Sequence, residues 1–90
     1  MKTYIIVLQL NAPEASYVNL TNYLQTASYW ARPYAFTWLI KATIDAAKLR
    51  DGVRERIAPN DKVIIMAIAN NDWGSYNIPK EVTDWMKNNL

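Results

Sequence analysis

Two segments of this chain are hydrophobic at both alternating sets of positions. In Thr3–Leu10 each set is apolar, apart from Gln9 near the end, and Lys62–Ala69 has the same pattern. A strand with apolar side chains on both sides lies in a sheet that is covered on both faces. Both segments are therefore predicted to be central strands, and the first ends with an uncharged polar side chain.

The remaining residues predict two further strands and three helices. Extended, β-rich residues favour strands at Trp30–Tyr34 and Phe36–Lys41. Pro33 cannot donate to a ladder, so the first of these should be an edge strand. A polar loop is expected at Asn70–Asn77. The helices are expected from about Glu14 to Ala27, from a cap at Thr43 or Asp45 to about Ile57, and from Pro79 onward.

The order of these elements predicts an α+β fold, the ferredoxin-like βαββαβ sandwich with a C-terminal helix. Ninety residues are predicted to form one domain, residues 1–90. With right-handed crossovers, the strands are expected in the order last, first, third, second. The last strand then lies at an edge although its pattern is that of a central strand, so we expect another segment or chain to cover it.

One face of this sheet is expected to need a partner, because two helices cover only the other face. The apolar residues predicted on it come from the first and last strands, and an apolar face of this kind is rarely left in water. We expect a homodimer, packed sheet to sheet or edge to edge, with the C-terminal helix contributing. The alternative is that Trp85 and Met86 fold back over the face within one chain. The predicted face consists of Ile5, Val7, Ile64, Met66 and Ile68.

The composition limits the chemistry. There is no His and no Cys, which removes the commonest general base, the commonest transition-metal ligand and the thiolate. Ten Lys and Arg against eight Asp and Glu give a net charge of +2, which permits nucleic-acid contact without indicating it. The N-terminal apolar run is too short and regular for a signal peptide or membrane span, so a cytoplasmic protein with no membrane partner is expected.

Six segments carry a resemblance to a known family. They are Tyr4–Asn11, the strand at Trp30, Thr37–Lys41 and Pro59–Lys62, with Tyr17–Leu20 and Leu49–Asp51 between them. Together they resemble the SinR-like small proteins, a family related to Cas-two, the small CRISPR-associated partner of the spacer integrase, and the strand Thr37–Lys41 is the most specific of them. The resemblance implies a ferredoxin-like dimer and a setting in antiviral or phage defence.

The resemblance also identifies what the first strand lacks. In the nuclease-type relatives an aspartate ends this strand, and one from each subunit holds a divalent cation for phosphodiester hydrolysis. Here the corresponding residue is Gln9, in the sequence Gln9-Leu10-Asn11. An amide can coordinate a metal through its oxygen but brings no charge to Mg²⁺. The resemblance therefore implies the family's shape without its hydrolysis.

Polar and aromatic residues near the strands supply candidate ligand-binding sites. Gln9 and Asn11 could bind a ligand at the former catalytic rim, or they could be turn residues that satisfy the backbone. Trp30, Arg32 and Tyr34, expected on one face, could clamp nucleotides together with Trp38. Alternatively, these four side chains pack under the helices or in a dimer interface.

Three further candidates are charged. Arg50 and Arg54 belong to a basic stretch that could meet a phosphate backbone. Asp51 and Glu55 lie among these bases, however, and a solvated helix face is the alternative. Asp72, in the loop after the last strand, is the best-placed remaining acid, and its alternative role is that of a turn residue.

Three functional hypotheses follow. The first is a non-catalytic homodimeric module, without a cofactor, that binds nucleic acid, a nucleotide-like molecule or a protein partner. The second is a weak Mg²⁺-dependent nuclease in which Asp72 or Glu14 replaces the lost acid. The third is a purely structural subunit. The sequence contains no Gly-rich phosphate loop, Ser/His/Asp set or metal-spaced cluster that would indicate another class of enzyme.

Overall fold

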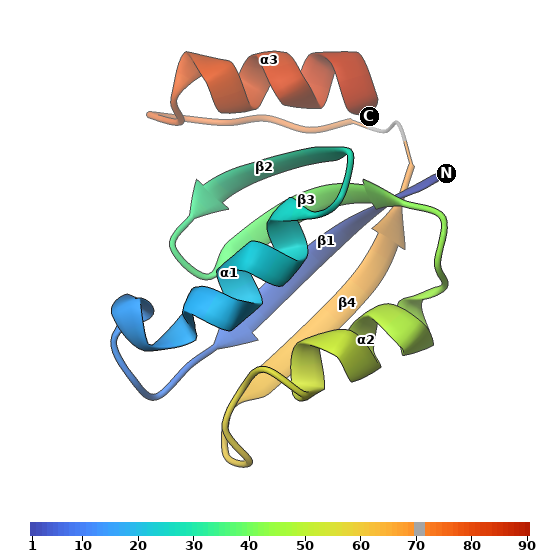
Figure 1. The fold of residues 1–90 in the computed structure, drawn as a ribbon. Helices are drawn as coiled ribbons and strands as arrows, with labels where there is room; N and C mark the ends of the chain where they lie inside the picture. The colour runs from blue at the N-terminus through green and yellow to red at the C-terminus, as the bar shows by residue number, and fades with distance from the viewer. Residues whose placement is uncertain (70–71) are drawn as a thin grey trace.

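A four-stranded antiparallel sheet organises the computed structural model, which describes residues 1–69 and 72–90. The strands lie in the order β2-β3-β1-β4, so β2 is an edge strand, as Pro33 predicted. The other edge is β4, as the crossovers predicted, and the prediction of a central strand from its hydrophobic pattern is wrong. The α+β class is confirmed, and the arrangement is consistent with a ferredoxin-like fold (Figure 1). The elements are β1 (Lys2–Gln9), η1 (Glu14–Tyr17), α1 (Val18–Gln25), β2 (Tyr29–Tyr34), β3 (Thr37–Ala42), α2 (Ala46–Arg54), β4 (Lys62–Ile68) and α3 (Lys80–Asn89).

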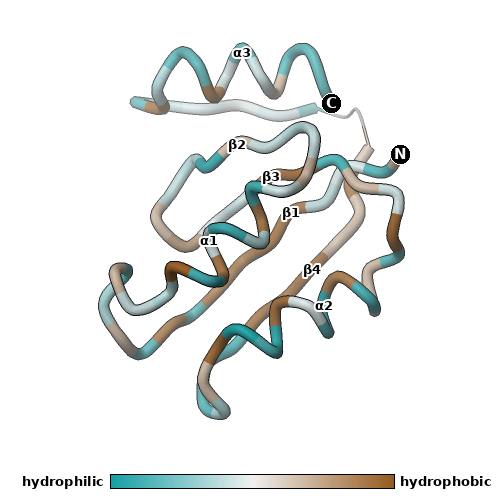
Figure 2. Tube along the Cα trace, in the orientation of Figure 1, coloured by the Kyte–Doolittle hydropathy of each residue, from teal (hydrophilic) through white to brown (hydrophobic). Residues whose placement is uncertain are grey.

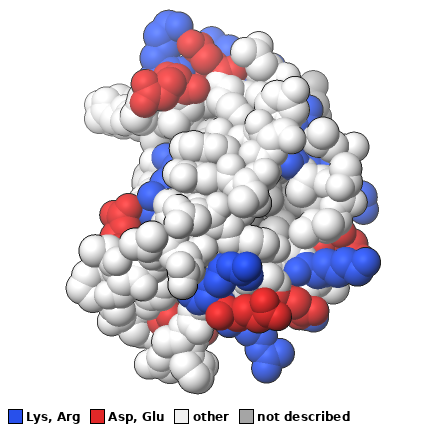
Figure 3. Space-filling view, viewed as in Figure 1, with Lys and Arg blue, Asp and Glu red and all other residues white. Residues whose placement is uncertain are grey.

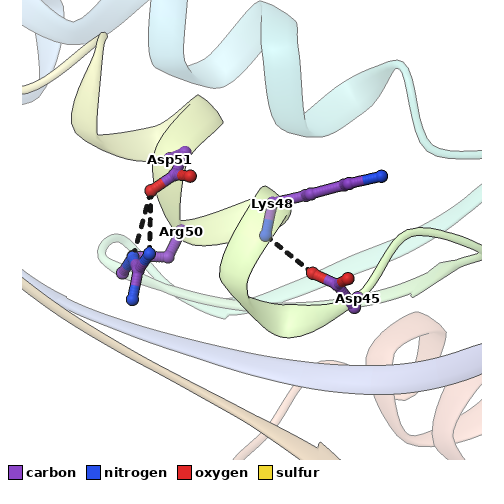
Figure 4. Close-up of polar contacts among 4 residues, drawn as sticks. All are labelled: Asp45, Lys48, Arg50 and Asp51. Atoms are coloured by element: carbon purple, nitrogen blue, oxygen red, sulfur yellow. Dashed lines mark hydrogen bonds and ion pairs between the residues drawn. The ribbon is translucent and has the colours of Figure 1, made fainter.

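Both first-face helices end earlier than predicted, α1 at Gln25 rather than about Ala27 and α2 at Arg54 rather than about Ile57, and the structure decides between the two predicted caps of α2. The first predicted helix begins as a 3₁₀ turn, η1, and Tyr17 (φ −115°, ψ 36°) separates this turn from α1. Asp45, not Thr43, caps α2, because its carboxylate accepts a hydrogen bond of 2.8 Å from the backbone N–H of Lys48 (Figure 4). Asn70 and Asn71, at the start of the predicted loop, lie outside the described residues.

The first face of the sheet is covered by α1 and α2, which lie together on the same side (Figure 1). Ile6 of β1 is fully buried there, as is Val53 of α2. Hydrophobic residues run along much of β1 and β4, whereas α2 alternates between hydrophobic and hydrophilic positions (Figure 2). The buried cluster on this face consists of Tyr4, Ile6, Leu8, Tyr17, Leu20, Leu24, Trp38, Ile40, Leu49 and Val53.

The second face is covered in part by α3, which lies apart from α1 and α2 (Figure 1). Trp85 and Met86 pack over this face within the same chain, which is the alternative that the sequence left open. The hydroxyl of Thr3 in β1 donates a hydrogen bond of 3.2 Å to the carbonyl oxygen of Asn89. The cluster under α3 consists of Ala31, Leu39 and Val82, with Ile5, Ile68, Ile78, Trp85 and Met86 around it.

The cover that α3 provides ends before it reaches all of β1 and β4. Val7, Ile64 and Met66 remain 42%, 62% and 53% exposed. Val7 pairs with Ile64 across the ladder, and Met66 pairs with Ile5, so these side chains are neighbours on one face. We call Val7, Ile64 and Met66 the open patch. All five residues predicted on the second face are accounted for, since Ile5 and Ile68 lie under α3.

A register shift in β2 corrects one prediction. Trp30 pairs with Ile40, but Tyr34 pairs with Thr37, and the ladder is irregular between Ala31 and Tyr34. Because paired side chains share a face, Trp30 lies on the first face and Tyr34 on the second. The expectation that Trp30, Arg32 and Tyr34 share one face is therefore wrong. Pro33 lies within the irregular part and cannot donate to the ladder there, which accounts for the shift.

Candidate functional site

Gln9 is the last residue of β1 and lies beside the open patch. Its side chain is exposed, and alternation along the strand places it on the same face as Val7. The residue opposite it in β4 is Lys62, which is also exposed. The end of β1 therefore presents an amide next to an ammonium group, at the border of an apolar surface. An amide and an ammonium group can hydrogen-bond a phosphate, but they supply no carboxylate for a metal ion.

Asn11 is committed to a network centred on Asp61. One carboxylate oxygen of Asp61 accepts hydrogen bonds from the backbone N–H of Asn11 (2.9 Å) and its side-chain amide (3.0 Å). The other oxygen accepts from the hydroxyl of Tyr17 and the backbone N–H of Ala58, both at 2.8 Å. These contacts join the turn after β1, the start of the helical segment and the turn before β4. Asn11 thus satisfies backbone and side-chain groups of the turn, the role that was predicted as the alternative to ligand binding.

The Asp61 network shifts the pKa of both acidic partners. Desolvation raises the pKa of the Tyr17 hydroxyl, and its hydrogen bond to Asp61 raises it further. For Asp61, desolvation acts to raise the pKa, but the hydrogen bonds from Ala58, Asn11 and Tyr17 outweigh it and lower the pKa below its ordinary value. The sequence offered only a weak signal for this residue, the turn sequence Pro59-Asn60-Asp61. Its distant partner Tyr17 could not be inferred from that signal.

The predicted aromatic and basic clamp is not assembled on the surface. Trp38 is only 1% exposed, and the guanidinium of Arg32 stacks 4.6 Å from the centroid of its ring. Arg32 also pairs with Glu14 at 2.8 Å and donates to the carbonyl oxygen of Ala35. Trp30 packs on Trp38 with a centroid distance of 5.4 Å. Trp38 and Arg32 serve packing, Trp30 packs on Trp38 but remains 39% exposed, and Tyr34 lies on the other face.

The bases of α2 lie among acids. Arg50 donates two hydrogen bonds to Asp51, of 3.0 and 3.1 Å, on the exposed side of the helix (Figure 4). Arg54 follows one turn later. It lines a hollow of about 410 Å³, and Asp61 is another of the residues that line this hollow. Lys and Arg side chains lie next to Asp and Glu in the view of Figure 3, with no broad field of one sign. This surface has the character of a solvated helix face.

Asp72 and Tyr34 meet at a cavity on the second face, which we call the α3 pocket. The cavity has a volume of about 530 Å³ and lies between the sheet, residues 72–78 and α3. Its floor is apolar, with Ile5 and Leu39 from the sheet and Met86 from α3. A pocket with a hydrophobic lining and few polar groups is the usual form of a small-molecule site. The sequence singled out both Asp72 and Tyr34 but gave no signal that they would line one cavity.

The acids considered for a displaced metal site lie on different faces. Glu14 precedes the first-face helices and is paired with Arg32, whereas Asp72 lines the α3 pocket on the second face. Within residues 1–69 and 72–90, no three acidic side chains gather as a metal site would require.

None of the helices in the described part of the chain combines the length and apolar character needed to cross a membrane. No protein-family model and no curated protein matches this chain.

Proposed function

We propose that this protein is a non-catalytic, homodimeric binding module with the ferredoxin-like βαββαβ sandwich and an added C-terminal helix. The observation that carries the proposal is the open patch, Val7, Ile64 and Met66, which remains exposed beside Gln9 after α3 has packed. The resemblance to SinR-like and Cas-two proteins supports the same shape and association. A setting in antiviral or phage defence is part of the proposal on that resemblance alone.

Self-association explains the open patch in physical terms. Ile64 and Met66 lie on β4, an edge strand whose outer backbone groups are free to pair or pack with another chain. A two-fold axis through the patch would place each of its residues against the same surface of a second copy, which is the geometry of most homodimers. The open patches of both copies would then be buried against each other, and the second face would gain the cover that its hydrophobic pattern requires.

Such a dimer would bring the polar border of the patch together from both chains. Each chain contributes Gln9 and, opposite it in the ladder, Lys62. Two amides and two ammonium groups can contact a phosphodiester backbone, but they supply no carboxylate to hold Mg²⁺ and activate water. We therefore propose nucleic acid as the ligand of this border, bound without hydrolysis.

A binding and cleavage assay with a matched control tests this function. The protein is incubated at low salt with labelled RNA, single-stranded DNA and double-stranded DNA, with Mg²⁺ or Mn²⁺ and with a chelator. We expect binding without cleavage, weakened by Lys62→Ala and less so by Gln9→Ala. Lys48→Ala, which removes an exposed base from α2 on the other face, should leave binding unchanged. The dependence of affinity on salt should also become less steep for Lys62→Ala.

Two outcomes would redirect the proposal. Chelator-sensitive cleavage that Asp72→Ala or Glu14→Ala abolishes would establish the alternative, a weak Mg²⁺-dependent nuclease with a displaced acid. Absence of binding to every nucleic acid at low salt would leave a structural subunit or a module for a protein partner.

A further inference from the structure

The α3 pocket is a separate feature of the second face. It is an open cavity between the sheet on one side and α3 and residues 72–78 on the other, and none of the open-patch residues lines it. Its volume of about 530 Å³ is within the range of small-molecule sites, and Ile5, Leu39 and Met86 make much of its surface apolar. The proposed dimer and the proposed nucleic-acid border therefore leave this pocket unexplained.

The polar lining of the pocket has one sign. Asp72 is a carboxylate, and no Lys or Arg is among the lining residues that the structure describes. Asp72 also takes no part in the ion pairs seen across residues 1–69 and 72–90. A ligand phosphate or carboxylate would meet a like charge here, whereas a cation would meet an opposite one.

The aromatic residues around the pocket favour the same kind of ligand. Tyr34 of β2 and Trp73 and Tyr76 of the segment before α3 all line it, and Tyr34 and Tyr76 are largely exposed. The faces of aromatic rings attract ammonium groups, and the sulfur of Met86 can pack against a ligand ring. Aromatic walls, an apolar floor and a single acid together define the complement of an amphipathic cation.

We propose that the α3 pocket binds a small aromatic amine in its ammonium form. The ring of the ligand packs on the apolar floor, and its ammonium group lies near the carboxylate of Asp72 and the rings of Tyr34 and Trp73. The discrimination expected is by charge, because a neutral analogue of the same shape keeps the apolar contacts and an anionic analogue adds repulsion at Asp72.

Three probes that share one ring system test this directly. Tryptamine, tryptophol and indole-3-acetate are cationic, neutral and anionic at neutral pH, and each is titrated into ¹⁵N-labelled protein. We expect each probe that binds to shift the amide signals of Ile5, Leu39 and Met86. The affinity should be highest for the cation, lower for the neutral probe and lowest for the anion. Equal affinities for the three probes, no shifts up to the solubility limit, or shifts confined to residues outside the pocket would overturn the proposal.

Variants separate the charge of the pocket from its shape. Asp72→Asn should weaken tryptamine roughly threefold to fivefold, as expected for an exposed charge pair, and leave tryptophol unchanged. Tyr34→Ala should weaken both, since it removes an aromatic wall from a side chain that is exposed enough to be dispensable for folding. Asp51→Asn, which removes an exposed acid from α2 on the other face, is the matched control and should change neither. If Asp51→Asn weakened tryptamine as much as Asp72→Asn, the assignment to this pocket would be wrong.

Discussion

The two faces of the sheet are built from the same strands, with hydrophobic residues alternating between them, yet helices cover the first face more completely than the second. On the first face, α1 and α2 bury Ile6 completely. On the second face, α3 covers Leu39 but leaves Ile64 62% exposed. The strand pattern specifies that both faces are hydrophobic, whereas the helices decide which of them becomes a core. The incomplete cover of the second face locates the surface on which we expect this protein to act.

The largest expected effect compares one substitution on each face. Ile6→Ala should lower the free energy of unfolding by about 2–5 kcal/mol, because Ile6 is fully buried and its removal leaves a cavity. Ile64→Ala, in the neighbouring strand, should lower it by less than about 1 kcal/mol in protein dilute enough to be monomeric. Urea unfolding followed by circular dichroism measures both. Equal losses would mean that the second face is as well packed as the first.

An intermediate effect separates α3 from the rest of the fold. Val82 is buried under α3, so Val82→Asp places an unpaired charge in that contact and should release the helix. The released helix should unfold, because ten residues are too few to remain helical in water on their own. Amide hydrogen exchange should become fast in Lys80–Asn89 while Ile6 stays protected. Asn88→Asp, on the exposed side of the same helix, is the control. Loss of protection at Ile6 together with Lys80–Asn89 in the Val82→Asp variant would contradict the separation of the faces.

The smallest effect concerns the pH dependence of the first face. The pKa of Asp61 is lowered in the folded chain, relative to an ordinary value of about 3.9 in the unfolded chain. Its contribution to stability is therefore complete above about pH 4 and is lost as the pH falls through the lowered value. Asp61→Asn should be less stable at neutral pH and should lose less stability on acidification to about pH 2. An unchanged acid dependence, matching that of an Asp51→Asn control, would show that the network contributes nothing.

The sequence predicted the strands well because their patterns are local. The double-sided hydrophobicity of β1, the edge position of the strand with Pro33 and the cap at Asp45 each depend on neighbouring residues. The same pattern in β4 predicted a central strand, yet β4 lies at an edge, because the connection between strands and not the local pattern decides its place in the sheet. The division of the second face between α3 and the open patch depends on where α3 docks, which no periodicity encodes. Tyr34 was placed on the wrong face because a register shift reverses the alternation on which the prediction relied.

The candidate site was predicted less completely than the fold. Gln9 lies on the expected face, beside the apolar surface, because alternation along β1 fixes its direction. Arg32 was expected on the surface as a possible ligand, but it pairs with Glu14, from a segment distant in sequence, and stacks on Trp38 of the neighbouring strand. The Asp61 network and the α3 pocket likewise bring together segments far apart in the chain. The ligand-binding roles proposed for Gln9 and for the α3 pocket stay predictions.

The central claim is that the open patch is an interface between two copies of this chain. Sedimentation equilibrium at tens of micromolar protein tests it most directly, with Ile64→Lys as the variant that places a charge in the patch and Lys48→Ala as the exposed control on α2. The account predicts the mass of two 10.4 kDa chains for the wild type and the control, and the mass of one chain for Ile64→Lys. A wild-type protein that sediments as a monomer, or an Ile64→Lys variant that remains a dimer, would contradict it.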